Sequence, residues 1–128
     1  MPSALTFDHA GNMRAIDIGA DSVLSELYEH IGCKIVRPLR VTRGITLWVD
    51  AEGADNGQKL NHDLSKVVDI LGGPDHIVYG PGVFLGSSES DQVLDLTRDD
   101  SEAIVMAQVL SARRQLRDLR DVRSPIRH

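Results

Sequence analysis

The sequence predicts an α+β fold, in which helices pack on a mainly antiparallel sheet and a long helix ends the chain. Two observations lead to this prediction. Segments with apolar residues at alternate positions come in pairs joined by Gly-containing turns, which is typical of β-hairpins. Three other segments carry apolar residues at helical spacing. The expected order is hairpin, helix, hairpin, helix, one or two strands, and a long helix.

The first hairpin is expected over residues 4–8 and 13–18, with a turn at residues 9–12. Its apolar residues alternate along both strands, and this pattern predicts one buried face made by Leu5, Phe7, Ile16 and Ile18.

A helix should follow, with Asp21 as its N-cap and Gly32 as the residue that ends it. The predicted apolar face of this helix consists of Leu24, Leu27, Tyr28 and Ile31.

The second hairpin is expected over residues 33–39 and 45–50. Pro38 has no N–H to donate to a ladder, so its strand should lie at the edge of the sheet. In the second strand Ile45, Leu47 and Val49 share one face. Trp48 points to the opposite face, where it either lies under another element or forms part of a contact surface.

Residues 50–59 contain no large apolar side chain and predict a loop. Asn61 is then a good N-cap for a helix that residues 72–74 should end. Its buried face is expected to be Leu64, Val67, Val68 and Leu71. Residues 76–85 are rich in β-branched and aromatic residues but contain Gly80-Pro81-Gly82, which predicts either one bulged strand or two strands that meet at a turn.

A polar linker at residues 87–91 precedes the last helix, whose acidic first turn and basic last turns suit the helix dipole. A helix over residues 101–120 would be about 30 Å long, so its apolar stripe should extend past the sheet. Such a stripe needs a partner, and a second copy of the chain is the commonest one. We therefore expect a homodimer, or a foreign partner, held by Val105, Val109, Leu116 and Leu119.

Composition excludes several classes of protein. The net charge of −5 argues against general attraction to nucleic acid, and a single cysteine allows neither an internal disulfide nor a cysteine-based zinc site. The five histidines lack metal-ligand spacing, and no nucleophile, acid/base pair or phosphate loop is recognisable. We expect no metal, no cofactor, no specific nucleic acid and no membrane, and a binding protein is favoured over an enzyme. Without a signal-peptide pattern, the cytoplasm of a host cell is the expected location.

Three segments carry a resemblance to a known family: Leu47 to Gly53, Asn61 to Leu71, and Val78 to Gly86, the last containing GPGVFLG. This Gly44–Gly86 core resembles a small domain of unknown function found mainly in bacteriophages and other mobile elements. The resemblance covers about residues 4–98, which we take as an α+β domain, and leaves residues 99–128 as a C-terminal helix with a basic tail. It implies an accessory protein that acts on host machinery.

Two functional hypotheses follow. The first is a non-catalytic accessory protein that binds and modulates a host or phage protein, with Trp48, the 50–59 loop and the last helix as contacts. The second is a small-molecule binder of nucleotide type, which would use Asn61, Tyr79, Gly80 and Gly82. An apolar patch around Trp48 would favour the first, and a pocket of convergent polar groups would favour the second.

Overall fold

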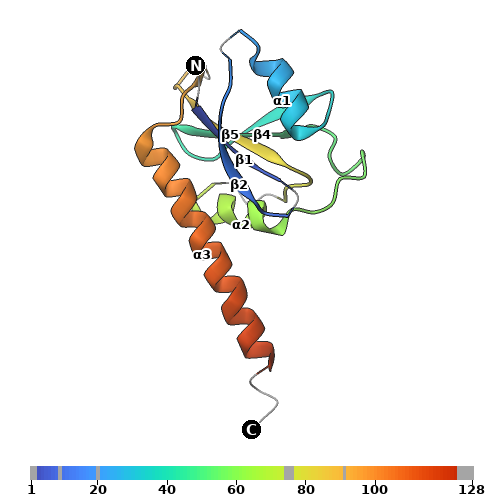
Figure 1. Ribbon diagram of the computed structural model, residues 1–128, viewed down its shortest axis with the longest axis vertical. Helices are drawn as coiled ribbons and strands as arrows, with labels where there is room; N and C mark the ends of the chain where they lie inside the picture. Colours follow the sequence, from blue (N-terminus) through green and yellow to red (C-terminus); the bar gives the residue numbers. More distant parts are fainter. Residues whose placement is uncertain (1–2, 9, 20, 74–76, 91, 124–128) are drawn as a thin grey trace.

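A six-stranded antiparallel sheet forms the centre of the structure (Figure 1), a computed structural model that describes residues 3–8, 10–19, 21–73, 77–90 and 92–123, with side chains of the last helix described as far as Arg113. Five strands lie in the order β2-β1-β5-β4-β3, and β6 pairs with β5. Their bounds are β1 Ser3–Phe7, β2 Met13–Asp17, β3 Val36–Arg40, β4 Ile45–Asp50, β5 Gly82–Ser87 and β6 Val93–Leu94.

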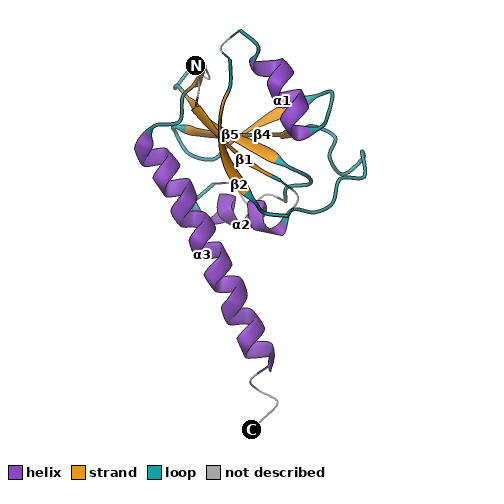
Figure 2. Cartoon of the chain, viewed as in Figure 1, coloured by secondary structure: helices purple, strands orange, loops and turns teal. Residues whose placement is uncertain are grey.

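Helices cover both faces of this sheet (Figure 2). Helices α2 (His62–Ile70) and α3 (Arg98–Arg123) pack on one face, where they share a core cluster with Phe7, Leu47 and Phe84. Helix α1 (Val23–Ile31) packs on the other face over a smaller cluster that includes Val83 and Leu85. The predicted α+β class is confirmed.

The first hairpin forms as predicted, but the expectation of one buried face was wrong. In the register of this hairpin, Leu5 pairs with Ala15 and Ile16 pairs with Ala4. Leu5 and Ile16 therefore point to opposite faces of the sheet. Leu5 and Phe7 enter the core under α2 and α3, whereas Ile16 and Ile18 belong to the cluster under α1. The physical reason is that helices cover the sheet on both faces, so both faces of β1 are apolar.

Helix α1 begins one residue later than predicted, because its N-cap is Ser22 and not Asp21. The Glu26 carboxylate accepts hydrogen bonds from the Gly19 N–H (2.6 Å) and the Ser22 hydroxyl (2.8 Å), and these bonds fix the start of the helix. Leu24 is 53% exposed, so it does not belong to the buried face, which Leu27 and Ile31 provide. Gly32 ends the helix as expected, in the left-handed conformation.

The second hairpin is confirmed, with β3 beginning at Val36. Pro38 lies on β3, and β3 is an edge strand, as its missing N–H requires. The three alternate apolar residues of β4 are all buried under α2 and α3, namely Ile45, Leu47 and Val49.

Helix α2 has the predicted N-cap, Asn61. Three of its four expected core residues are buried, Leu64, Val67 and Val68, but Leu71 is only partly buried because it is the C-cap and lies where the chain leaves the helix. The strand expected from residue 76 begins only at Gly82; before it, Tyr79 makes an isolated bridge with Leu60, and His76 lies outside the described residues. Strand β6 was not predicted.

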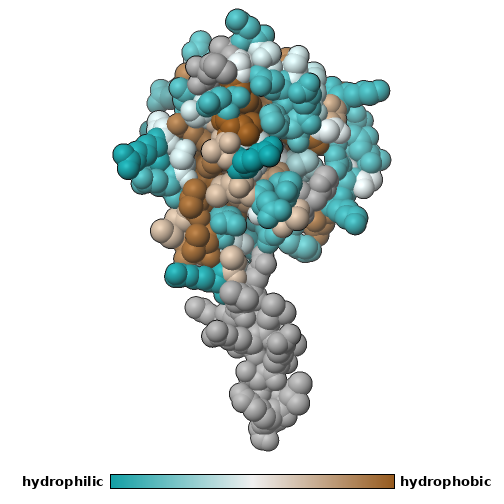
Figure 3. Space-filling model, in the orientation of Figure 1, coloured by the Kyte–Doolittle hydropathy of each residue, from teal (hydrophilic) through white to brown (hydrophobic). Residues whose placement is uncertain are grey.

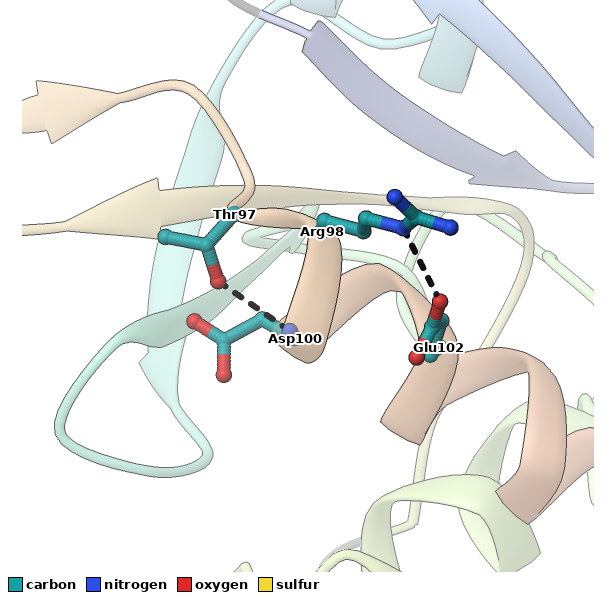
Figure 4. Close-up of polar contacts among 4 residues, drawn as sticks. All are labelled: Thr97, Arg98, Asp100 and Glu102. Carbon is teal, nitrogen blue, oxygen red and sulfur yellow. Dashed lines mark hydrogen bonds and ion pairs between the residues drawn. The ribbon is translucent and has the colours of Figure 1, made fainter.

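Helix α3 begins at Arg98, one residue before the expected start at Asp99, and Thr97 caps it through a hydrogen bond from the Asp100 N–H to the Thr97 hydroxyl oxygen (3.1 Å; Figure 4). An exposed ion pair between Arg98 and Glu102 (3.2 Å) spans its first turn. The first part of α3 packs beside α2, and the later part extends away from the sheet (Figure 1).

Candidate binding site at Trp48

A cavity of about 220 Å³ opens on the face of the sheet that α1 covers only in part. Strands β3, β4, β5 and β6 all contribute to it, and its lining consists of Pro38, Arg40, Thr46, Trp48, Gly86, Ser87, Gln92 and Val93. The alternation of β4 creates this wall, because Ile45, Leu47 and Val49 enter the core under α2 and α3 while Thr46 and Trp48 point the other way. The register places Pro38 beside Trp48 and Arg40 beside Thr46.

Trp48 is half-buried against the α1 cluster, and its indole nitrogen is fully buried with no hydrogen-bond partner in the described part of the chain. A buried donor without a partner costs about 1–3 kcal/mol. A conformational adjustment that brings an acceptor to this N–H would recover that cost. Trp48 therefore forms an apolar wall of the cavity, and its indole N–H is a donor that could still form a hydrogen bond.

Two hydroxyl groups lie on the same wall. The buried Thr46 hydroxyl donates to the Ser87 hydroxyl oxygen at 2.9 Å, and a hydroxyl that accepts in this way is able to donate to an acceptor in the cavity.

Arg40 supplies positive charge at the rim. Its guanidinium donates to the carbonyl oxygens of Arg43 (2.9 Å) and Ser88 (3.2 Å), so the charge is held in place rather than free to move. The cavity thus combines apolar walls, hydroxyl groups and a fixed cation.

The other predicted ligand residues lie elsewhere, at a junction on the α2 side of the sheet. The Asn61 amide nitrogen donates to the carbonyl oxygens of Asp8 (3.0 Å) and Gly80 (3.0 Å), and its side-chain oxygen accepts from the Leu64 N–H (3.1 Å). Asn61 is buried, and its polar atoms join three distant segments of the chain. This use leaves its two amide donors engaged within the fold.

Gly82 is a close-packing position. A Cβ atom there would lie 2.9 Å from the Cδ1 atom of Leu47 and 2.9 Å from the Cδ2 atom of Leu64, in the middle of the core. Gly80 has φ of 82°, which glycine adopts without strain. The Gly-Pro-Gly segment therefore allows β5 to pass close under α2.

Tyr79 lines a second cavity, of about 230 Å³, together with Asp50 and much of the loop after β4. Asp50 begins the polar 50–59 segment that the sequence predicted as a loop, yet it is only 6% exposed. Its carboxylate accepts hydrogen bonds from the side chains of Asn56 and Gln58 and from the Glu52 N–H. Burial alone would raise the pKa of Asp50, but these three donors lower it on balance.

Asp50 thus organises the 50–59 loop through its hydrogen bonds, a role that the sequence pattern did not predict. An Asp followed by Gly and Asn residues is a signal for such a turn. What the signal lacks is the burial of the carboxylate, which depends on packing.

On α3 the apolar residues that were predicted to bind a partner are different from the residues that pack on the domain. Ile104, Ala107 and Ser111 are buried on the domain side, while Val105 is 42% exposed. Val109 is half-buried, and Leu116 and Leu119 lie outside the described side chains. Met106 and Leu110 add further exposed apolar surface, and hydrophobic side chains are visible over this part of α3 in Figure 3.

The single cysteine of the chain is not a reactive nucleophile. Burial raises the pKa of the Cys33 thiol, as does the nearby negative charge of Asp50, so the thiol is not activated as a nucleophile. Among the described residues no group of three or more His, Cys, Asp and Glu side chains is placed to hold a metal ion. None of the helices, over the residues described, has both the length and the apolar character needed to cross a membrane.

Comparison with known protein families gives a match over most of the chain. Residues 2–109 match the family described as "Domain of unknown function (DUF3846)". No curated protein and no solved structure matches the chain. The match spans most of the chain, and it confirms the expectation that the chain contains a family domain of unknown function.

Proposed function

The chain belongs to the DUF3846 family, and we propose that it is a non-catalytic accessory protein of a bacteriophage or mobile element that binds and modulates a host or phage protein through the Trp48 cavity. The observation that carries the proposal is an open cavity whose wall is a half-buried tryptophan, and the buried indole N–H of this tryptophan has no hydrogen-bond partner among the residues that the structure describes. The resemblance of the Gly44–Gly86 core supports the phage or mobile-element setting.

The size of the cavity supports a protein as the partner. Small-molecule sites usually enclose about 300–1,000 Å³, and this cavity has about 220 Å³. That volume suits one anchoring side chain of a partner better than a nucleotide. Binding energy at protein interfaces is concentrated in Trp, Tyr and Arg residues that form or fill such pockets, and Trp48 and Arg40 both line this one.

The residues that line the cavity indicate which chemical groups a partner should place in it. Pro38, Val93 and the Trp48 ring favour an apolar side chain. The Ser87 hydroxyl and the Arg40 guanidinium favour a carbonyl or carboxylate oxygen next to it. We therefore expect an apolar anchor residue flanked by an acidic residue or an exposed carbonyl group.

A small-molecule binder of nucleotide type is the second candidate. The observation in its favour is the polar part of the same lining, Thr46, Ser87 and Arg40. The Asn61 site that the sequence suggested gives it little support, because both amide donors of Asn61 are engaged by the fold.

Affinity capture with matched variants tests the proposal. Gln92 is exposed and lines the cavity, so Gln92→Tyr should block the opening without disturbing the core. Leu94→Tyr is the control, because Leu94 is 45% exposed and does not line the cavity. The wild type and Leu94→Tyr should retain the same lysate protein, and Gln92→Tyr should lose it.

Two results would contradict the proposal. One is a protein retained equally by all three chains. The other is a low-molecular-weight compound, and no protein, retained by the wild type and lost by Gln92→Tyr, which would support the second candidate instead.

A further inference from the structure

Helix α3 carries apolar residues on the side that packs on the domain and also on sides that are exposed in the described part of the chain. The inner side, Ile104, Ala107 and Ser111, packs on the domain. The outer side, which we call the seam, begins with Val105, Val109 and Ala112, and of these Val105 and Ala112 are exposed. The alternating spacing of four and three residues continues the seam to Leu116 and Leu119 on a helix that is unbroken to Arg123. This spacing is that of a coiled-coil contact.

The length of α3 indicates what could cover the seam. Of its 26 residues, the last described residue buried against the domain is Ser111, near the middle of the helix. The 12 residues after Ser111, up to Arg123, extend about 18 Å further at 1.5 Å per residue. The first half of the helix thus offers an exposed apolar strip, and the second half offers an extension of similar length. The second half of α3 in one copy is therefore long enough to cover the first half of α3 in a second copy, and the reverse also holds.

Charge determines the direction of such a pairing. Residues 98–110 contain three acidic residues and one arginine, whereas residues 111–123 contain five arginines and two aspartates. A parallel pair would bring like-charged halves together. An antiparallel pair places the acidic half of each helix beside the basic half of the other, which is favourable.

We propose that α3 binds α3 of a second copy in an antiparallel arrangement, with the two-fold axis beside Ala112. Val105 and Leu119 lie seven residues on either side of Ala112, so Val105 lies level with Leu119 of the second copy. Val109 lies three residues before Ala112 and Leu116 four residues after it, so these two come within about one residue, or 1.5 Å, of the same level. Alanine at the axis allows the two helices to approach closely. The Trp48 cavity lies on the opposite face of the sheet, so this dimer leaves the cavity of each copy open.

The mass of the protein in solution gives the first test. At tens of micromolar, light scattering should report twice the 14.0 kDa of one chain. Leu116→Asp combined with Leu119→Asp should reduce this mass by half, and the circular dichroism and urea midpoint of the domain should stay the same. Leu24→Asp, a change on the exposed side of α1, should leave the mass of the dimer unchanged. A wild-type protein of 14.0 kDa at this concentration would overturn the proposal.

Cross-linking tests the direction of the pairing in a Cys33→Ala background, which removes the single native cysteine. Positions 105 and 119 are about 21 Å apart along one helix, and a disulfide requires Cα atoms within about 7 Å. Val105→Cys and Leu119→Cys should therefore cross-link only when the two variants are expressed together. Cross-linking of each variant with itself would show a parallel pair and would overturn the proposed arrangement.

Discussion

Asn61→Asp separates two roles that Asn61 has in the structure. Aspartate is as good an N-cap as asparagine, so capping alone predicts almost no change in stability. The amide of Asn61, however, also donates to the carbonyl oxygens of Asp8 and Gly80. A carboxylate cannot donate, and it would face both oxygens from a buried position.

The expected cost follows from these contacts. Each carbonyl left without its donor costs about 1–3 kcal/mol, so the two together cost about 2–6 kcal/mol. The introduced charge adds to this cost unless the carboxyl group takes up a proton. Since domains of this size are stable by only about 5–15 kcal/mol, the substitution should be severe at neutral pH.

Urea denaturation as a function of pH provides the assay. Burial raises the folded-state pKa of the introduced carboxyl group above its unfolded value of about 3.9. The variant should therefore be least destabilised below about pH 4, and should lose stability as the pH rises through the folded-state pKa. Asn61→Ser, which keeps a capping oxygen without the charge, should show a smaller loss at pH 7 and no such pH dependence. An Asn61→Asp variant within about 0.5 kcal/mol of the wild type at pH 7 would refute the reasoning, because it would show that the two amide bonds contribute nothing.

Three further predictions concern the core, the loop and nucleic acid. Gly82→Ala should lower the free energy of unfolding by about 1–3 kcal/mol, because its methyl group overpacks the space between Leu47 and Leu64; an unchanged urea midpoint would contradict this. The lowered pKa of Asp50 gives the wild type stability that is present above about pH 4 and is lost as the pH falls through the folded-state pKa. The difference in unfolding free energy between the wild type and Asp50→Asn should accordingly shrink toward pH 2, and a constant difference would show that the carboxylate charge has no role. Affinity for duplex DNA at physiological salt should be no better than about 10⁻⁴–10⁻⁶ M because the net charge is −5, and submicromolar binding lost on Arg113→Ala would reverse that prediction.

Local signals predicted the elements better than they predicted which face of each element is buried. Pro38 lies at a sheet edge because it lacks an N–H, and Asn61 caps a helix because its side chain accepts a hydrogen bond from a backbone N–H. In both cases the signal comes from a single residue. The buried face of the first hairpin was misassigned because the hairpin has apolar residues on both sides. Periodicity identifies those sides but does not say which one meets the core. Only the packing of the whole chain decides that.

The candidate site was predictable only in part. Alternation along β4 placed Trp48 on the face opposite Leu47, and the structure agrees. The cavity itself depends on β6, a strand of two residues with no signal in the sequence, and on how far α1 covers the sheet. The hydrogen bond from the Asn61 amide to the Asp8 carbonyl oxygen likewise joins residues that are 53 positions apart, which no local sequence pattern could reveal.

The emission of Trp48 tests the central claim most directly, because Trp48 is the single tryptophan of the chain and lines the proposed site. The measurement is a titration of the purified protein with a tryptophan-free peptide that spans the contact region of the captured partner. We predict a saturable shift of the Trp48 emission to shorter wavelength, as the partner excludes water from the cavity. The same shift should appear with Leu94→Tyr and should be lost with Gln92→Tyr. Saturable binding of the peptide, detected by calorimetry, with no change in Trp48 emission would place the contact elsewhere and would contradict the account.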